Sequence, residues 1–183
     1  MQDISDLSAF IQARPALVRA LEAVAKLELP DGWIGAGFIR NAVWDALHGI
    51  EQAAAFGDVD VAFFDQSRTD AERDAVIEAE LRRTFPQMPW SVKNQARMHR
   101  RNGDAPYEDT LAAVARWPET ATAVAARWRA GRVEGIAPHG LGDLIDLVVR
   151  PTPAFAGRPE IVRRRIREKK WLLRWPRLTV VGV

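Results

Sequence analysis

The stretch that most restricts the fold is a tight turn, Gly35-Ala36-Gly37, followed about twenty residues later by Asp58-Val59-Asp60. After the turn, Ile39, Val43 and Leu47 recur at helical spacing and place one apolar face on a helix. The aspartates open a segment that alternates and then becomes wholly apolar, as a buried strand does. The order strand, turn, helix, acidic strand therefore predicts a chain in which helices and strands alternate.

The turn has the beginning of a dinucleotide-binding fingerprint but lacks its later parts. That fingerprint needs a third glycine where this chain has Arg40. It also places a single acid at the end of the second strand, whereas two aspartates stand at the start of the strand here. Both differences disfavour a dinucleotide loop.

Strand alternation puts the carboxylates of Asp58 and Asp60 on one face, only a few ångströms apart. Two carboxylates so close repel each other unless a cation lies between them, and carboxylate oxygens are ligands for hard divalent cations. The turn and the helix N-terminus after it can hold an anion. A Gly-x-Gly turn or an Asp-x-Asp pair alone is more often structural. Together they indicate metal-assisted phosphoryl or nucleotidyl transfer.

This arrangement resembles the polymerase-β-like nucleotidyltransferase superfamily. The turn is also similar to the Gly-Gly-x-Val-Arg-Asp opening of the tRNA CCA-adding enzymes, although Asn41 replaces their acid and the gap to the aspartates is longer. A closer resemblance is to a bacterial nucleotidyltransferase-like family. Six phrases between Trp33 and Leu178 carry it: "GAGFIRN", "DVDVAFFD", "VKNQARMH", "WPETATAVAAR", "APHGL" and "WPRL".

The resemblance implies an α+β fold, with a mixed β-sheet flanked by helices, and a catalytic role for Asp58 and Asp60 as ligands of Mg²⁺ or Mn²⁺. It also implies that Gly35, Ala36 and Gly37 hold the triphosphate of an NTP. The expected reaction moves a nucleoside monophosphate to a hydroxyl of an RNA, a protein or a small molecule.

The superfamily usually has a third carboxylate on a neighbouring strand, and in this chain Ser91 occupies the position where that acid is expected. Glu134, Asp143 and Asp146 are the other candidates for it. The substitution leaves open an alternative function, a catalytically inactive nucleotide- or RNA-binding module that keeps the fold. A purely structural or partner-binding domain is a third interpretation.

Other polar residues have two interpretations each. Arg40, on the first turn of the helix, can pair with a phosphate or with a core carboxylate such as Asp58. A polar stretch after the strand over residues 89–94 can read a base or acceptor, or it can satisfy buried backbone groups in a loop. Its candidate binding residues are Asn94, Gln95, Arg97 and His99.

Charge is unevenly distributed along the chain. The formal net charge is +2, yet the segment Arg158–Arg177 holds nine Lys or Arg residues against Glu160 and Glu168. This local balance of +7 leaves the rest of the chain near −5. The segment can be a helix whose basic face is solvated or docks on the acidic body, or it can attract a polyanion such as RNA or a nucleoside triphosphate.

The 183 residues are expected to form one domain, with an N-terminal helical segment (1–30), an α/β core (31–157) and a basic C-terminal helix and tail (158–183). The absence of cysteine excludes disulfides, thiolate zinc sites and cysteine nucleophiles. No apolar run long enough for a membrane span and no secretion signal are visible, so we expect a cytoplasmic protein without a membrane partner.

Periodicity predicts the remaining elements. Thr69 is expected to cap a helix, with Glu72 completing a capping box. A polar loop is expected over residues 100–107. Helices are predicted over residues 4–26 (as a hairpin or broken helix), 69–85, 109–117 and 159–173, and strands over residues 31–34, 58–64, 89–94, 120–128 and 133–137.

Overall fold

A computed structural model describes residues 1–51 and 57–183. In this part of the chain, a five-stranded mixed sheet has the strand order β3-β2-β1-β4-β5. Its β2 and β3 are parallel and the other neighbours are antiparallel. The strands are β1 (Trp33–Gly35), β2 (Val59–Phe63), β3 (Trp90–Asn94), β4 (Ala125–Arg129) and β5 (Arg132–Ile136). The mixed sheet expected from the sequence is confirmed.

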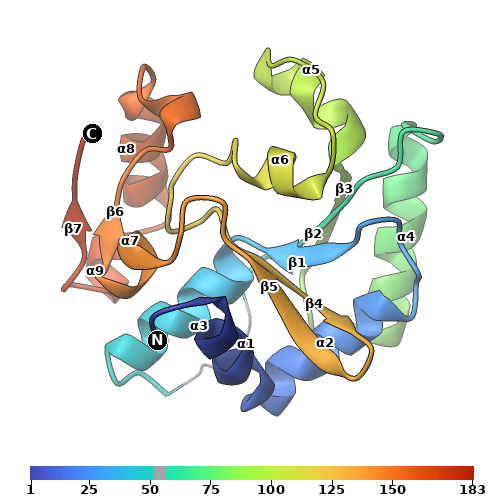
Figure 1. Cartoon of the computed structure of the whole chain (residues 1–183), viewed down its shortest axis with the longest axis horizontal. Coiled ribbons are helices and arrows are strands. Elements are labelled where there is room, and N and C mark those ends of the chain that lie inside the picture. Colours follow the sequence, from blue (N-terminus) through green and yellow to red (C-terminus); the bar gives the residue numbers. More distant parts are fainter. Residues whose placement is uncertain (52–56) are drawn as a thin grey trace.

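Helices flank this sheet (Figure 1). Figure 1 shows α1 and α2 on one side of it and α5 and α6 on the other, while α8 and α9 lie beside a second, two-stranded sheet of β6 and β7. The helices are α1 (Ile4–Gln12), α2 (Pro15–Ala25), α3 (Gly37–Leu47), α4 (Ala71–Thr84), α5 (Met98–Asn102), α6 (Thr110–Val114), α7 (Gly142–Ile145), α8 (Pro159–Glu168) and α9 (Trp171–Arg174), with 3₁₀ turns η1 (Gln95–Arg97) and η2 (Pro153–Phe155). The small sheet pairs β6 (Val148–Val149) with β7 (Thr179–Val180) in parallel.

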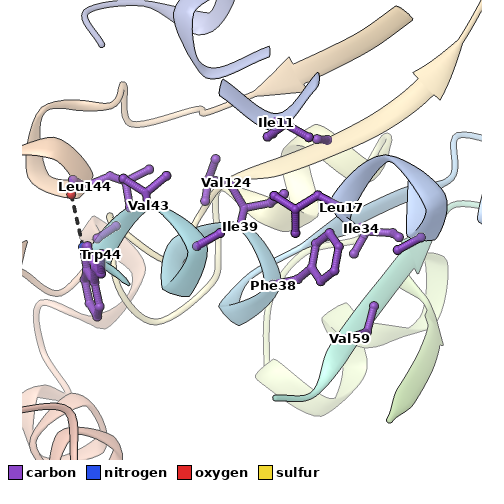
Figure 2. Close-up of a cluster of buried hydrophobic side chains, with 14 of the residues drawn as sticks. Ile11, Leu17, Ile34, Phe38, Ile39, Val43, Trp44, Val59, Val124 and Leu144 are labelled. Carbon is purple, nitrogen blue, oxygen red and sulfur yellow. Dashed lines mark hydrogen bonds between the residues drawn. The ribbon is translucent and has the colours of Figure 1, made fainter. Parts of the chain in front are cut away.

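The buried core fixes the position of α3. Figure 2 shows Ile39 and Val43 of α3 among apolar side chains from α1, α2 and β1, such as Leu17 and Ile34. At the far end of α3, the buried Trp44 donates a hydrogen bond from its indole nitrogen to the carbonyl of Leu144 at 3.1 Å (Figure 2). The helix that follows the glycine turn is therefore anchored along its length.

Local hydrogen bonds and proline explain where the first helices begin, and in one case the helix begins at a different residue from the one expected. The predicted helical hairpin over residues 4–26 forms, and Pro15 starts its second helix. The N-cap of α4 is Asp70 and not Thr69, because a side-chain oxygen of Asp70 accepts the backbone N–H of Arg73 at 2.9 Å.

Three other expectations were wrong. The strand predicted over residues 120–128 begins only at Ala125, because the carbonyl of Glu119 accepts the N–H groups of Thr122 and Ala123 and forms a turn. The last helix, predicted as continuous, breaks between α8 and α9, where Lys170 has a left-handed backbone with φ of 51°. The polar loop expected over residues 100–107 begins only after Asn102, because Met98–Asn102 form α5.

No helix in residues 1–51 or 57–183 is both long and apolar enough to cross a membrane.

Candidate active site

The glycine turn lies beside the second aspartate. In the antiparallel pair of β1 and β2, Gly35 is the partner of Asp60. Ala36 follows with φ of 54° and ψ of −128°, and α3 begins at Gly37. Such a backbone is uncommon for a residue with a side chain, and strained positions cluster at functional sites. The positive end of the α3 dipole is thereby placed next to β2.

The three residues of the turn have different roles. A Cβ on Gly35 would lie 2.7 Å from the Trp117 ring and 2.8 Å from the carbonyl of Val124, so Gly35 permits close packing. The N–H of Ala36 donates to the same Val124 carbonyl at 3.0 Å. Gly37 has no contact that close.

A cavity of about 470 Å³ opens at this turn, and we call it the glycine-turn cavity. It brings two carboxylates together with four cationic side chains and the first turn of α3. Its lining is Ala36, Gly37, Arg40, Asn41, Gly57, Asp58, Asp60, Arg165, Lys169, Trp171, Arg174 and Trp175. Of the three residues predicted to hold the triphosphate, Ala36 and Gly37 line the cavity and Gly35 does not.

The two carboxylates of the cavity differ in environment. Asp58 is exposed and forms a 3.7 Å ion pair with Lys169. Asp60 is half-buried, and burial raises the pKa of its carboxyl, with a further rise from the negative charge of Asp58. Lys169, Arg165 and Arg40 act in the opposite direction. A divalent cation between the aspartates would relieve the desolvation and the repulsion, so this donor set fits a hard metal ion.

Arg40 is a buried cation on the cavity wall. Its guanidinium stacks on Trp171 at 4.2 Å, and it donates hydrogen bonds to Thr122 Oγ1 at 2.7 Å and Asn41 Oδ1 at 2.8 Å. Burial lowers the pKa of Arg40 to about 10, which still leaves it charged at neutral pH. It forms no ion pair with Asp58 or another described carboxylate, and its Nε–H has no described hydrogen-bond partner. A buried cation without a directly bonded carboxylate favours an anionic ligand.

The basic C-terminal segment forms one side of the same cavity. Arg165 of α8 binds the fully buried Glu119 through a 2.6 Å ion pair. Arg174 of α9 pairs with the buried Asp45 at 2.9 Å, and that carboxylate also accepts the indole N–H of Trp175 at 2.8 Å. These contacts dock the segment on acidic groups, which is one of the two arrangements expected from the sequence.

Five cations of that segment remain exposed without a carboxylate partner in the described residues. They are Arg163, Arg164, Arg167, Lys170 and Arg177. The segment therefore also presents positive charge to solvent, which fits both a solvated basic face and attraction of a polyanion.

A second cavity of about 340 Å³, the flanking cavity, adjoins the first one at Asp60. Ala36, Asp60 and Arg165 line both cavities. The remaining lining of the flanking cavity is Val61, Ala62, Ser91, Lys93, Gln95, Met98, Arg101, Asn102, Arg116, Trp117, Pro118, Thr122 and Phe155. Asp60 thus stands where the two cavities meet.

Of the four polar residues predicted after β3, only Gln95 lines a described cavity. Asn94 is buried, and its amide donates to the carbonyls of Asp65 and Arg68, each at 2.8 Å. Arg97 pairs with Asp74, and the His99 ring lies edge-on to Tyr107. The contacts of Asn94 and Arg97 match the alternative interpretation, a hydrogen-bonded segment that secures the end of β3.

The expected place of the third carboxylate is occupied by Ser91. The parallel register of β2 and β3 makes Ser91 the partner of Asp60, and both line the flanking cavity. Glu134 pairs with Arg127, Asp143 pairs with Arg150, and neither they nor Asp146 lines either cavity. Residues 1–51 and 57–183 contain no cluster of three His, Cys, Asp or Glu side chains suited to hold a metal ion.

Comparison with known proteins agrees with this geometry. A nucleotidyltransferase family model matches residues 22–180, and the chain belongs to that family. A solved structure described as a CCA-adding enzyme head domain has 32% sequence identity and a TM-score of 0.86, over 98% of this chain and 96% of that one. The polymerase-β-like nucleotidyltransferase fold and membership of an enzyme family, both predicted from the sequence, are confirmed.

Whole CCA-adding enzymes share the fold at lower identity. The Thermotoga maritima CCA-adding enzyme in complex with tRNA matches with 16% identity and a TM-score of 0.53, over 98% of this chain. A CCA-adding enzyme with CTP matches with 15% identity and a TM-score of 0.54, also over 98%. The chain spans only 42% and 43% of the lengths of these enzymes. No curated protein matches the chain.

Proposed function

We propose that this nucleotidyltransferase is metal-dependent and moves a nucleoside monophosphate from an NTP to a hydroxyl of its acceptor. The observation that carries the proposal is the glycine-turn cavity, where Asp58 and Asp60 meet the N-terminus of α3 and four cationic side chains. Two clustered carboxylates suit a divalent cation, and the cations and the helix dipole suit the triphosphate.

In this proposal, each group of the chain acts on a different part of the substrate. Asp58 and Asp60 would hold Mg²⁺ or Mn²⁺, which when bound neutralises polyphosphate charge and polarises the reacting phosphoryl group. Arg40, Arg165 and Lys169 bind the outer phosphates. Much of the rate comes from this positioning and charge stabilisation.

The transfer itself makes one bond and breaks one bond. The acceptor hydroxyl oxygen bonds to the α-phosphorus, and the bond from that phosphorus to the bridging oxygen of the β-phosphate breaks. Pyrophosphate leaves with the electron pair, and the hydroxyl proton passes to water. Asp58 and Asp60 are the only acids that line either described cavity, which supports water as the proton acceptor.

The test is transfer of label from α-labelled NTPs to candidate acceptors, including RNA and small alcohols. Because both aspartates would hold the metal, the variant Asp58→Asn/Asp60→Asn should lose at least about a hundredfold in rate. The matched control Glu108→Gln/Asp146→Asn removes two exposed carboxylates outside the cavities and should transfer normally. Equal transfer by wild type and the aspartate variant would remove the assignment.

RNA is the acceptor class for which a specific observation exists. The exposed cations Arg163, Arg164 and Arg167 of α8 lie on the helix that carries Arg165 into the cavity. A structural relative is bound to tRNA. We therefore propose that α8 contacts an RNA backbone, with or without turnover.

A further inference from the structure

We propose that the flanking cavity is the acceptor subsite and that it selects an acceptor with a phosphate group close to its reactive hydroxyl. This inference rests on the proposed function and deepens it, since it names the chemistry of the acceptor. The residues that carry it are Lys93 and Arg101, together with Arg116.

The direction of the reaction assigns the flanking cavity to the acceptor. In phosphoryl and nucleotidyl transfer, the attacking and leaving oxygens lie roughly in line on opposite sides of the phosphorus. Ala36, Asp60 and Arg165 line both cavities, so the two cavities adjoin at Asp60. With the leaving pyrophosphate in the glycine-turn cavity, the acceptor approaches from the flanking cavity.

The charge of the flanking cavity favours an anion. Four cations line it, namely Lys93, Arg101, Arg116 and Arg165, against the single carboxylate of Asp60. Arg116 and Arg165 are paired with Asp104 and Glu119. Lys93 and Arg101 have no carboxylate partner among the described residues, and the ammonium of Lys93 donates only to the carbonyl of Val92, at 2.8 Å. Both cations are thus available to a phosphate.

The register of the sheet sets the spacing of this phosphate from the reaction. Asp60 pairs with Ser91, and Ala62 pairs with Lys93, so Ser91 and Lys93 share the face of β3 that lies beside Asp60. Two residues along a strand span roughly 7 Å. A single sugar ring bridges that distance between a phosphate at Lys93 and a hydroxyl near Asp60.

Hydrogen bonds hold the opposite wall of the cavity in place. The Tyr107 hydroxyl donates to Asp104 at 2.5 Å and accepts from the Asn102 amide at 2.9 Å. Asp104 in turn pairs with Arg116 at 2.9 Å. Burial and the neighbouring carboxylate raise the pKa of Tyr107 to about 12, so the hydroxyl remains a donor across the working pH range. Arg116 and Asn102 are therefore positioned before a ligand arrives.

A binding experiment tests the subsite without requiring turnover. The full-length ¹⁵N-labelled protein is titrated with ribose 5-phosphate and with ribose, and amide shifts are followed. Ribose 5-phosphate should shift residues of β3 and α5, while ribose should not. Lys93→Gln and Arg101→Gln should each weaken binding about tenfold, the loss expected for one charge-assisted hydrogen bond.

Arg100→Gln is the matched control, since Arg100 neighbours Arg101 on α5, is exposed and lines neither cavity. Its affinity for ribose 5-phosphate should be unchanged. Equal binding of ribose and its phosphate, equal loss in Arg100→Gln, or shifts confined to the glycine turn would each overturn the assignment. Because no nucleotide is transferred, these outcomes are independent of the label-transfer test.

A transfer experiment then separates two sources of the phosphate. Label transfer is compared between ribose 5-phosphate and ribose, and between a short oligoribonucleotide and a free nucleoside. Transfer to either phosphate-bearing member over its neutral partner supports the subsite and identifies the source as a sugar phosphate or an RNA 3′ end. Equal transfer to the neutral partners would overturn the subsite. So would an effect of Lys93→Gln on the KM for NTP alone, because the cavity would then bind the nucleoside of the NTP.

Discussion

At the scale of single residues, neighbouring positions in one turn carry different constraints. Gly35 is required by packing, because its backbone lies against Trp117 and the carbonyl of Val124. Gly37 starts the helix that faces the cavity. From the sequence motif alone, both glycines are expected to belong to a phosphate-binding loop. The difference depends on a tryptophan about eighty positions away, which a local pattern does not contain.

Substitution of Gly35 by alanine is predicted to destabilise the fold. The added Cβ would lie 2.7 Å from a rigid ring and 2.8 Å from backbone, so the free energy of unfolding in urea should fall by about 1–3 kcal/mol. Gly142→Ala is the control, because a Cβ there meets open space, and it should change stability by less than about 1 kcal/mol. Equal effects of the two substitutions would contradict the packing role.

At the scale of elements, the sequence predicts what nearby residues determine. The glycine turn and the Asp58-Val59-Asp60 strand start follow from alternation and spacing, and the neighbouring strand with Ser91 was expected from the family resemblance. The break between α8 and α9, and the packing of these helices beside the glycine-turn cavity, do not follow from alternation and spacing. The docking of the two helices depends on ion pairs with Glu119 and Asp45, which are distant in sequence. Lys93 and Arg101 were missed although alternation places Lys93 on the face of Ser91.

The ion pair that holds α9 in place gives a prediction for Asp45. Asp45→Asn weakens the buried acceptor of Arg174 and Trp175, and should lower the free energy of unfolding by about 1–3 kcal/mol. Because α9 lines the glycine-turn cavity, affinity for an NTP should fall as well. Glu134→Gln disrupts an ion pair with Arg127 outside both cavities and should leave NTP affinity intact. Denaturation and equilibrium binding together check this, and unchanged NTP affinity in Asp45→Asn would contradict it.

At the scale of the whole molecule, charge is segregated between an acidic body and a basic C-terminal segment. Part of that basic charge is used internally, by Arg165, Lys169 and Arg174, which face the cavity. Most of the remainder is exposed, with Arg163, Arg164 and Arg167 on α8 and Lys170 and Arg177 after it. The two arrangements considered for this segment from the sequence are therefore complementary, since docking positions some cations and leaves others for a polyanion.

The exposed cations predict salt-dependent RNA binding. The slope of log affinity against log salt should become shallower by about 2 in Arg163→Gln/Arg164→Gln/Arg167→Gln, because each lost phosphate contact removes about 0.7. Arg19→Gln/Arg68→Gln/Arg129→Gln removes three exposed cations elsewhere and should leave the slope unchanged. The contact would be refuted by RNA binding that does not depend on salt, or by equal slopes in both triple variants.

The central claim concerns one location, the glycine-turn cavity with Asp58 and Asp60 on its wall. The most direct measurement is a crystal structure of the protein with Mn²⁺ and a non-hydrolysable NTP, in which anomalous scattering locates the metal. We predict metal bound by both aspartates and a triphosphate between the N-terminus of α3 and the side chains of Arg40, Arg165 and Lys169. A triphosphate bound elsewhere, or a metal without either aspartate, would contradict the account.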